Sequence, residues 1–471
     1  DDVESRGLGD VYKRQIIAAL QAPVYMPAVA YAVQEKTDAT PKQFKSFATK
    51  NKVSDDYKYG YLNIDWWDKF NDPVLSDYIV RALQNNHDLK VATLNVETYY
   101  QNVRAQFAGE LPQIGVGFAP NYMKMPGTSH SDWMFAVPGI VSYEADIFLK
   151  NRDKTKSVKK LYEASKFDER AAYIAVASAV GTTYLNIVKL DKMIELQEEI
   201  VKSRQMIYDL MLKRNHEGIT STSDTIEANK DLVNGQTDLV ELKKQRSKLL
   251  NQLAVLVGES PANAESLKRT SLDTINHNAE IPASISSEVI MQRPDYLKAE
   301  KMVEKAGIDV RVAKKEFLPT ISLSGLALFN ASDFGSIFTT KNMLWSLGGG
   351  LLLPLFTGGR RLATLRLKKT EYEKVLHNYY QTNLTAIQEV NDALVAVRLD
   401  KAKMDQTLKQ ADLEADDYKY NELKYDEGVI SKLDLLQFKE NLLYVNKLVA
   451  QQKAECMVDY IALYKATGSK L

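Results

Sequence analysis

Cysteine is almost absent from this sequence, since Cys456 is the only one among 471 residues. A single cysteine excludes an internal disulfide and a metal site built from several cysteines. We expect Cys456 to be a small residue packed between helices. An excess of either charge is also missing: Lys and Arg number 61, as do Asp and Glu. The chain therefore has no net positive charge that would favour nucleic acid as a partner.

Long apolar runs and catalytic motifs are missing as well. The body of the chain has no apolar run of about eighteen residues, which argues against a helical membrane span but leaves short barrel strands open. The five histidines show no His-Glu-x-x-His spacing, and no serine lies in Gly-x-Ser-x-Gly. We therefore expect no enzyme, no cofactor and no metal site.

One short stretch is also compatible with binding a metal ion. MKMPGTSH, residues 123–130, combines two methionines with a histidine, and such side chains suit soft metals in a metal-efflux duct. A loop at the outer mouth of a barrel explains the same residues equally well, and we favour that interpretation.

The first 32 residues are unlike the rest of the chain. DDVESRGLGDVYKRQ has no initiator Met, and we expect it to be non-native or truncated sequence. The basic pair Lys13-Arg14 near its end is followed by a moderately apolar run and the small-x-small ending Ala30-Tyr31-Ala32. This order is typical of a secretory signal peptide cleaved after Ala32. No cysteine follows a lipobox, so no lipid anchor is visible.

The body of the chain is a duplication. Residues 87–118 and 294–325 align at a constant offset of 207, with Arg104 matching Arg311 and both segments reaching Leu-Pro near their ends. Further along, HEGITSTSD (216–224) matches DEGVISKLD (426–434) at an offset of 210. A period this long is not that of a solenoid. It indicates two homologous halves with small differences in their loops.

Each half repeats one order of elements. A helix precedes two alternating stretches typical of strands, and two very long helices follow. The predicted first helices are 75–109 and 284–317, the strand pairs are 113–122 with 133–143 and 320–330 with 343–356, and the long helices are 153–215, 224–258, 360–426 and 434–467. The domains predicted from this order are residues 1–32, an extended segment 33–74, a first repeat 75–258, a linker 259–283 and a second repeat 284–467.

The long helices carry apolar residues at heptad spacing. Leu435, Leu442 and Val449 form one row, and a second row runs beside it through Leu436, Leu443 and Ala450. In the first half, Ile226, Val233 and Val240 repeat the second row. Heptad rows predict coiled-coil packing. Two adjacent rows place a neighbour on both sides of a helix, as in a closed helical cylinder.

The strands suit a membrane barrel. About ten residues cross a bilayer when tilted, but four strands cannot close, and open edges cannot face lipid. The chain must therefore form oligomers, and three copies would supply twelve strands. Trp133 and Trp345 each open a strand, which suits an interfacial aromatic girdle, although ordinary strand aromatics would look the same.

Several long motifs resemble one family. They are WWDKFNDPVLSDYIVRALQNNHDL (66–89), RPDYLKAEKMVEKAGIDVRVAKKEFLPTISLSG (293–325), PLFTGGRR (354–361) and YYQTNLTAIQEVNDAL (379–394). With these motifs in order over about residues 60–467, the chain resembles the TolC-like outer-membrane efflux proteins, most closely the branch that serves tripartite RND-type multidrug pumps.

The resemblance implies an α+β membrane protein of a Gram-negative-type bacterium. It implies a homotrimer with a twelve-stranded barrel in outer-membrane lipid, continuous with a long periplasmic α-barrel that holds most of the mass. A mixed equatorial region would come from about residues 40–72, 259–283 and the C-terminus. The implied function is passive export of drugs or other small compounds delivered by a periplasmic adaptor and an inner-membrane pump.

Two features depart from that family pattern. Many members of the branch carry an acylated N-terminal cysteine, which this sequence does not show. The first half also has YEADIFLKNRD where the second half has PLFTGGRR. The Asp-x-Phe version is the usual first-half form in the family.

The turns at 215–224 and 425–434 are the best candidates for a functional site. Gly218 and Gly428 each end a long helix, and the next helix can be capped by Ser221 and Ser431 or by Asp224 and Asp434. The resemblance makes these turns the periplasmic tip where the adaptor docks. It makes the two aspartates the candidate gate carboxylates.

The resemblance also suggests partners for the gate aspartates. Ser223 and Tyr425 are candidate hydrogen-bond partners. Three subunits would bring like charges together, which favours cations and makes opening depend on pH and partner contact. Some relatives carry an Arg at the position of Ile430, so a gate salt bridge there is not expected.

The glycine-rich stretch LWSLGGGLLLPLFTGGRR, residues 344–361, is not a phosphate loop. It lacks both the Gly-Lys-Ser/Thr ending and the Gly-x-Gly-x-x-Gly spacing. Pro354 would end a strand, where a backbone donor can be spared. Gly358 and Gly359 would turn the chain into the helix starting at Arg360. We interpret the three residues as a barrel-to-helix hinge.

A second class of function remains open from the residues alone. Long coiled coils also build soluble scaffolds, such as a periplasmic adaptor. The paired alternating strands, present twice and flanked by Trp, argue against that alternative.

Overall fold

The computed structural model describes residues 66–124, 129–277, 285 and 287–468. Most of the predicted N-terminal segments and part of the linker 259–283 lie outside these residues, as do four positions of MKMPGTSH. The described chain divides into a strand unit, residues 112–144 and 322–350, and a helical unit that contains the rest. Each unit is described separately below.

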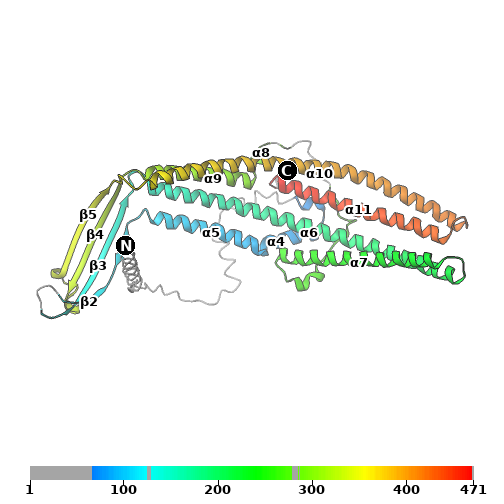
Figure 1. Ribbon diagram of the computed structural model, residues 1–471, viewed down its shortest axis with the longest axis horizontal. Helices are drawn as coiled ribbons and strands as arrows, with labels where there is room; N and C mark the ends of the chain where they lie inside the picture. Colours follow the sequence, from blue (N-terminus) through cyan, green and yellow to red (C-terminus); the bar gives the residue numbers. More distant parts are fainter. Residues whose placement is uncertain (1–65, 125–128, 278–284, 286, 469–471) are drawn as a thin grey trace, which may run out of the picture. The chain divides into compact units, whose positions relative to one another are not determined.

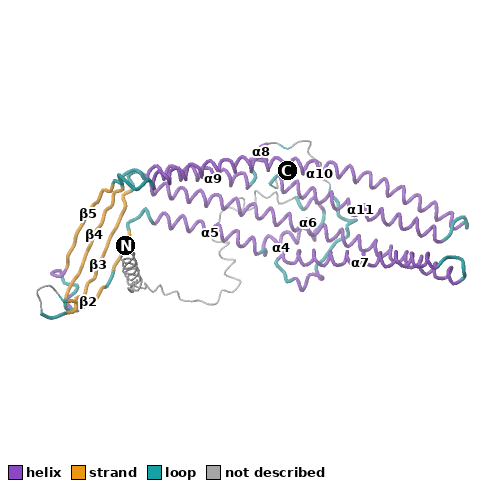
Figure 2. Tube along the Cα trace, viewed as in Figure 1, coloured by secondary structure: helices purple, strands orange, loops and turns teal. Residues whose placement is uncertain are grey.

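The helical unit is built from four very long helices and several shorter ones (Figure 2). Their bounds are α4 Pro73–Asn85, α5 His87–Ala108, α6 Lys150–His216, α7 Thr222–Val257, α8 Ser287–Met291, α9 Pro294–Lys315, α10 Arg360–Asp426 and α11 Lys432–Ala466. The long helices lie where the sparse glycine and heptad rows predict them, and their ends differ from the prediction by at most three residues.

The two predicted shorter helices were wrong in one respect, because each is interrupted. The first breaks at Asn86, whose side chain accepts hydrogen bonds from the backbone N–H groups of Asp88 and Leu89 at 2.9 and 3.1 Å. That side chain caps a new helix, so α4 and α5 are separate. In the second half, Pro294 begins α9, since proline suits the first turn of a helix and not its interior.

The long helices pack as two hairpins side by side. α6 pairs with α7, α10 pairs with α11, and α11 packs against α6, which gives the order α7, α6, α11, α10 seen in Figure 1. Along the rest of its length α6 packs against α5 and α9. α7 and α10 are therefore the outer helices of this layer.

The heptad rows divide between the interior and the surface. Leu436, Leu443 and Ala450 of α11 are buried, as the coiled-coil pattern predicts. The matching row of α7 is open: Ile226, Val233 and Val240 are 53%, 50% and 66% exposed. In the single chain, this predicted seam has no partner covering it.

The main core lies in the middle of the helical unit. Trp66 stacks on Tyr464 with ring centroids 5.4 Å apart, and Leu272 and Ile275 are buried in the same cluster. The structure thus brings together the start of the described chain, the 264–277 segment and the C-terminal end of α11. These are parts of the three segments that the resemblance assigns to an equatorial region.

One described helix, α6, contains an 18-residue window that is long and apolar enough to cross a membrane. Of that window, 61% is buried inside the protein. Burial against neighbouring helices accounts for its apolar character.

The strand unit is one antiparallel sheet, with segments β1 Gln113–Val116, β2 Ala119–Met123, β3 Asp132–Ala145, β4 Thr320–Ala331 and β5 Met343–Leu352. The order is β1-β3-β4-β5, and β2 also pairs with β3. The predicted strand 113–122 is interrupted opposite Pro138, which has no N–H to donate to the ladder. The strand predicted to run to residue 356 ends at Leu352.

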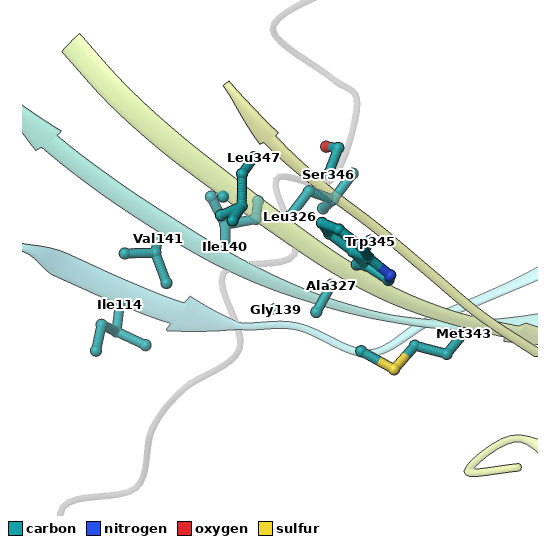
Figure 3. Close-up of a pocket in the computed structure, with 11 residues that line it drawn as sticks. Ile114, Gly139, Ile140, Val141, Leu326, Ala327, Met343, Trp345, Ser346 and Leu347 are labelled. Atoms are coloured by element: carbon teal, nitrogen blue, oxygen red, sulfur yellow. The ribbon is translucent and has the colours of Figure 1, made fainter. Parts of the chain in front are cut away.

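The two faces of the sheet differ in chemistry. On one face, a Cβ placed on Gly325 would meet Leu347 and Val141, and these positions line a shallow apolar groove (Figure 3). On the other face, a Cβ on Gly350 would meet the Ser322 hydroxyl. The alternation places Trp133 and Trp345 on the apolar face, and both are more than half exposed, at 53% and 67%.

Candidate functional site

The turn between α6 and α7 is closed by a left-handed glycine. Gly218 has φ of +75°, and the backbone N–H of Ile219 donates to the carbonyl of Arg214 at 2.8 Å. This bond spans the helix end in the manner of a Schellman motif, which needs a residue without a Cβ penalty at the turn. The side chain of Asn215 then donates to the carbonyl of Thr220 at 2.9 Å.

Ser221 and Asp224 together begin α7. The backbone N–H of Asp224 donates to the Ser221 hydroxyl, and the backbone N–H of Ser221 donates to the Asp224 carboxylate, both at 3.1 Å. The arrangement is a capping box. Serine is therefore the N-cap, and the aspartate returns the bond from the third helical position.

The turn between α10 and α11 repeats this geometry. Gly428 has φ of +74°, and Ser431 forms the same capping box with Asp434. Here the Ser431 hydroxyl also donates to the Asp434 carboxylate at 2.6 Å. The duplication detected in the sequence is thus preserved down to single hydrogen bonds.

The carboxylate of Asp434 is stabilised in its charged form. Hydrogen bonds from the Ser431 side chain and backbone lower the pKa of Asp434, and the positive charge of Arg214 adds to this effect. Arg214 lies in the last turn of α6, so a cation from one hairpin acts on the aspartate of the other. The sequence did not single out Arg214. Its position in a basic helix end was the available signal.

The other predicted members of this site lie in the same two turns. Ser223 is exposed in the first turn of α7. Tyr425 lies near the end of α10 with the Lys432 ammonium 4.9 Å from its ring centroid. Among the described residues, neither side chain hydrogen-bonds to Asp224 or Asp434, whose partners are the serines that cap the helices.

Both turns end in an exposed apolar residue. Ile219 is 60% exposed and Val429 is 70% exposed. Each follows the left-handed glycine directly. The tip of each hairpin therefore offers a carboxylate on a rigid capped helix beside an uncovered branched side chain.

The predicted hinge residues occupy the start of α10. Gly358 and Gly359 have φ of +60° and +80°, and α10 begins at Arg360. Pro354 lies two residues beyond β5, and its carbonyl accepts from the Arg361 guanidinium at 3.3 Å. The chain turns into the helix where the two glycines predict.

The first half makes the equivalent turn without glycine. Leu149, the residue before α6, has φ of +58°, which is strained for a residue with a Cβ. The Asp146 carboxylate holds this turn by accepting from the backbone N–H groups of Asn151 and Arg152 at 3.0 and 2.8 Å. The Asp-x-Phe sequence is thus a side-chain cap where the second half has glycines.

The described residues contain no group of three or more His, Cys, Asp or Glu side chains that could hold a metal ion. The tips can attract or exclude ions by charge, and they can present a surface to another protein. They show no arrangement of a nucleophile and a base among the residues described.

Comparison with known proteins covers both halves of the chain. Residues 78–259 and 285–469 match the model of the outer membrane efflux protein family. TtgC of Pseudomonas putida, described as a probable efflux pump outer membrane protein, is 28% identical over 410 residues, which cover 86% of this chain and 84% of that protein.

Two further relatives extend the comparison. The cation efflux system protein CusC of Escherichia coli K12 is 26% identical over 415 residues, covering 87% of this chain and 89% of CusC. The crystal structure of the CmeC outer membrane channel of Campylobacter jejuni superposes with a TM-score of 0.79 at 25% identity, covering 87% of this chain and 88% of CmeC.

Proposed function

The chain belongs to the outer membrane efflux protein family, and from that membership we propose that it is the exit duct of a tripartite efflux pump. As an outer membrane efflux channel of a Gram-negative bacterium, it has a large helical part in the periplasm. It is a transporter and not an enzyme. An inner-membrane pump and a periplasmic adaptor would deliver small compounds to its helical tip.

The observation that carries this proposal is the family match across both halves. The match includes the helical hairpins and the segments that contain the strands, so it is not a likeness between coiled coils alone. A soluble scaffold would share the hairpins and would not need the sheet. The relatives' names differ in cargo, and CusC is named for cations, so the transported class stays unspecified.

The functional unit is a homotrimer in this proposal. Among the described strands, β5 and the β1/β2 pair lie at the sheet edges with no further strand beside them. Open edges in lipid leave backbone groups unpaired at a cost of several kcal/mol each. Three sheets of this kind would close a twelve-stranded barrel, with Trp133 and Trp345 on its lipid-facing side.

The two tip turns form the gate in this proposal. Asp224 and Asp434 of three subunits would gather six carboxylates around one axis, which favours cations and disfavours anions. The capping boxes fix the positions of these carboxylates. Ser223 and Tyr425 remain candidate partners across subunits, because neither is engaged with the aspartates within its own chain.

The proposed duct is tested by locating the protein and measuring its current. We expect the full-length protein in the outer-membrane fraction and ion conduction by the purified protein in planar bilayers. Recovery from the soluble periplasm, or no conductance from a folded oligomer, would contradict the proposal.

The gate is tested by neutralising its charges. The double variant Asp224→Asn and Asp434→Asn keeps an oxygen that can accept the capping bonds and removes the charge, so the turns should persist. We expect a lower cation preference and a single-channel conductance raised by about twofold or more. Asp405→Asn, an exposed acidic position on α10, is the control. Equal selectivity and conductance in all three proteins would remove these aspartates from the gate.

A further inference from the structure

Positive charge is concentrated where the chain passes between helices and strands. Residues 104–111, 146–160, 311–318 and 353–369 contain fifteen Lys and Arg but only four Asp and Glu. The whole chain has equal numbers of both. The excess in these four segments is therefore a local feature, and we call the surface they form the junction surface.

The four segments meet at one end of the helical unit. Gln106 of α5, Lys154 of α6, Glu316 beside α9 and Lys368 of α10 line one groove. Figure 1 shows the end of α5, the start of α6, the end of α9 and the start of α10 together at that end. The cations thus gather in space as well as in sequence.

Two of the four acidic groups of the junction surface, Asp146 and Asp153, are engaged within the protein. The carboxylate of Asp153 binds Arg311 at 2.8 Å and Lys315 at 2.7 Å. Asp146 is the side-chain cap of α6. Several cations, in contrast, make no ion pair with any described residue: Lys154, Lys159, Lys314, Arg360, Arg366 and Lys369. The surface therefore carries a surplus of uncompensated positive charge.

Exposed apolar side chains lie in the same segments. Leu355 and Phe356 are 88% and 89% exposed, and three residues separate them from the arginine pair that begins α10. Ile147 is 63% exposed just before Lys150, and Phe317 is 41% exposed just after Lys315. Apolar residues next to cations are typical of the boundary between lipid headgroups and acyl chains.

The opposite end of α10 shows that this charge is not a general property of the helix. Its first ten residues, 360–369, include five Lys and Arg and no Asp or Glu. Its final part, residues 412–426, has six Asp and Glu against two Lys. Exposure alone would not separate the two signs along one helix. The separation places all five cations at the start of the helix. Arg360 and Arg361 lie within ten residues of the end of β5 at Leu352. Arg366, Lys368 and Lys369 follow within about two more helical turns.

We propose that the junction surface binds anionic phospholipid headgroups of the periplasmic leaflet. The cations would contact headgroup phosphates, while the exposed Phe and Leu side chains of the same segments enter the acyl region. This inference rests on the proposed function, because it needs the strands to lie in the outer membrane. A free phosphate would satisfy the cations and leave the apolar side chains uncovered, so a lipid fits the combination better.

Lipid retention by the intact protein tests the assignment. The wild-type oligomer is reconstituted in nanodiscs of phosphatidylcholine with an equal share of phosphatidylglycerol, released into detergent, and weighed by native mass spectrometry. We expect phosphatidylglycerol to be retained in preference to phosphatidylcholine. Changing Arg360, Arg366 and Lys369 to Gln should lower that preference by about a hundredfold, since each cation near a charged membrane surface contributes about 1 kcal/mol, or about fivefold.

A matched variant on the same helix separates position from total charge. Lys401, Lys409 and Lys419 of α10 are exposed and have no ion pair among the described residues. Changing these three to Gln should leave the lipid preference at the wild-type value. An equal loss in both variants, or no preference in the wild type, would overturn the inference. Preferential retention of added lipopolysaccharide would overturn it in favour of the other leaflet.

Fractionation and conductance measurements on the same protein distinguish a failure of this inference from a failure of the proposed duct function. A protein that fractionates with the outer membrane and conducts ions, yet retains no anionic phospholipid, contradicts only the lipid assignment. A protein absent from the outer membrane contradicts the proposed function first.

Discussion

His277 is a half-buried titratable side chain held between aromatic rings. Its ring stacks on Tyr460 at 3.8 Å between centroids and lies 4.6 Å from Phe70. Burial lowers the pKa of His277 from 6.5 to about 4, and the charge of Lys69 adds to this. This environment therefore favours the neutral imidazole.

This burial predicts a pH dependence of stability. The unfolded chain binds the proton near pH 6.5 and the folded chain only near pH 4. The stability that neutral His277 contributes to the fold is thus fully present above pH 6.5, falls as pH drops toward 4, and changes no further below pH 4. A pKa difference of this size corresponds to at most about 3 kcal/mol, and solvent screening of the half-buried ring reduces the contribution.

A matched variant isolates the histidine from other acid-sensitive groups. His277→Phe keeps a ring in the stack and removes the titration. Thermal melting followed by circular dichroism at pH 7 and pH 4.5 should show a smaller loss of stability on acidification in His277→Phe than in the wild type. The same loss in both proteins would show that the proton does not act at this residue.

The tip turns are defined at the level of whole elements. α6 and α10 each end two residues before a glycine with φ near +75°, and α7 and α11 each start with a Ser–Asp capping box. Local sequence is enough to produce this geometry, because every bond of the turn lies within a few residues. Either hairpin should therefore form its turn without help from the other.

Backbone conformation, and not space, makes Gly428 necessary. A Cβ added there would meet no atom within 4 Å, so the cost of Gly428→Ala comes from the left-handed φ alone, about 1 kcal/mol. Gly115→Ala is the control, because its Cβ also meets nothing and no left-handed φ is involved. We expect a lower melting temperature for Gly428→Ala only, and an equal effect in both variants would contradict the argument.

At the scale of the whole molecule, we expect the outer helices to determine assembly. Beside the open heptad row on α7, α10 has its own exposed row, with Leu399, Leu413 and Tyr420 at 61%, 70% and 59% exposure. The two rows lie on different outer helices. A contact between α7 of one copy and α10 of the next would therefore be head-to-tail, which closes into a ring where the rotation between copies allows it.

The assembly prediction concerns this seam. We expect the wild type to run as a heat-sensitive trimer in mild detergent. Val233→Glu with Val240→Glu should shift it toward monomer at micromolar concentration, because a charge in a coiled-coil seam loses its solvation. Asn234→Glu, at an exposed position on the same helix but about 100° around it from Val233, should leave the trimer intact. A stable trimer with both seam substitutions would exclude α7 from the interface.

The sequence by itself determined the features that depend on local or periodic order. The two halves, the long helices, the alternating strands, the left-handed glycines of the tips and the glycine pair before α10 were all predicted from the residues. Periodicity reports which face of an element is apolar, and a turn is built from bonds between near neighbours. The candidate site was located in this way, and its role as a gate stays a prediction.

Only the tertiary structure decided the features that join distant parts of the chain. The effect of Arg214 on Asp434 crosses from one hairpin to the other, and His277 meets Tyr460 across 183 positions. The strand break opposite Pro138 depends on the partner strand, and Leu149 holds a left-handed φ that its residue type disfavours. Such contacts are selected by packing and charge in the folded chain, which no local pattern records.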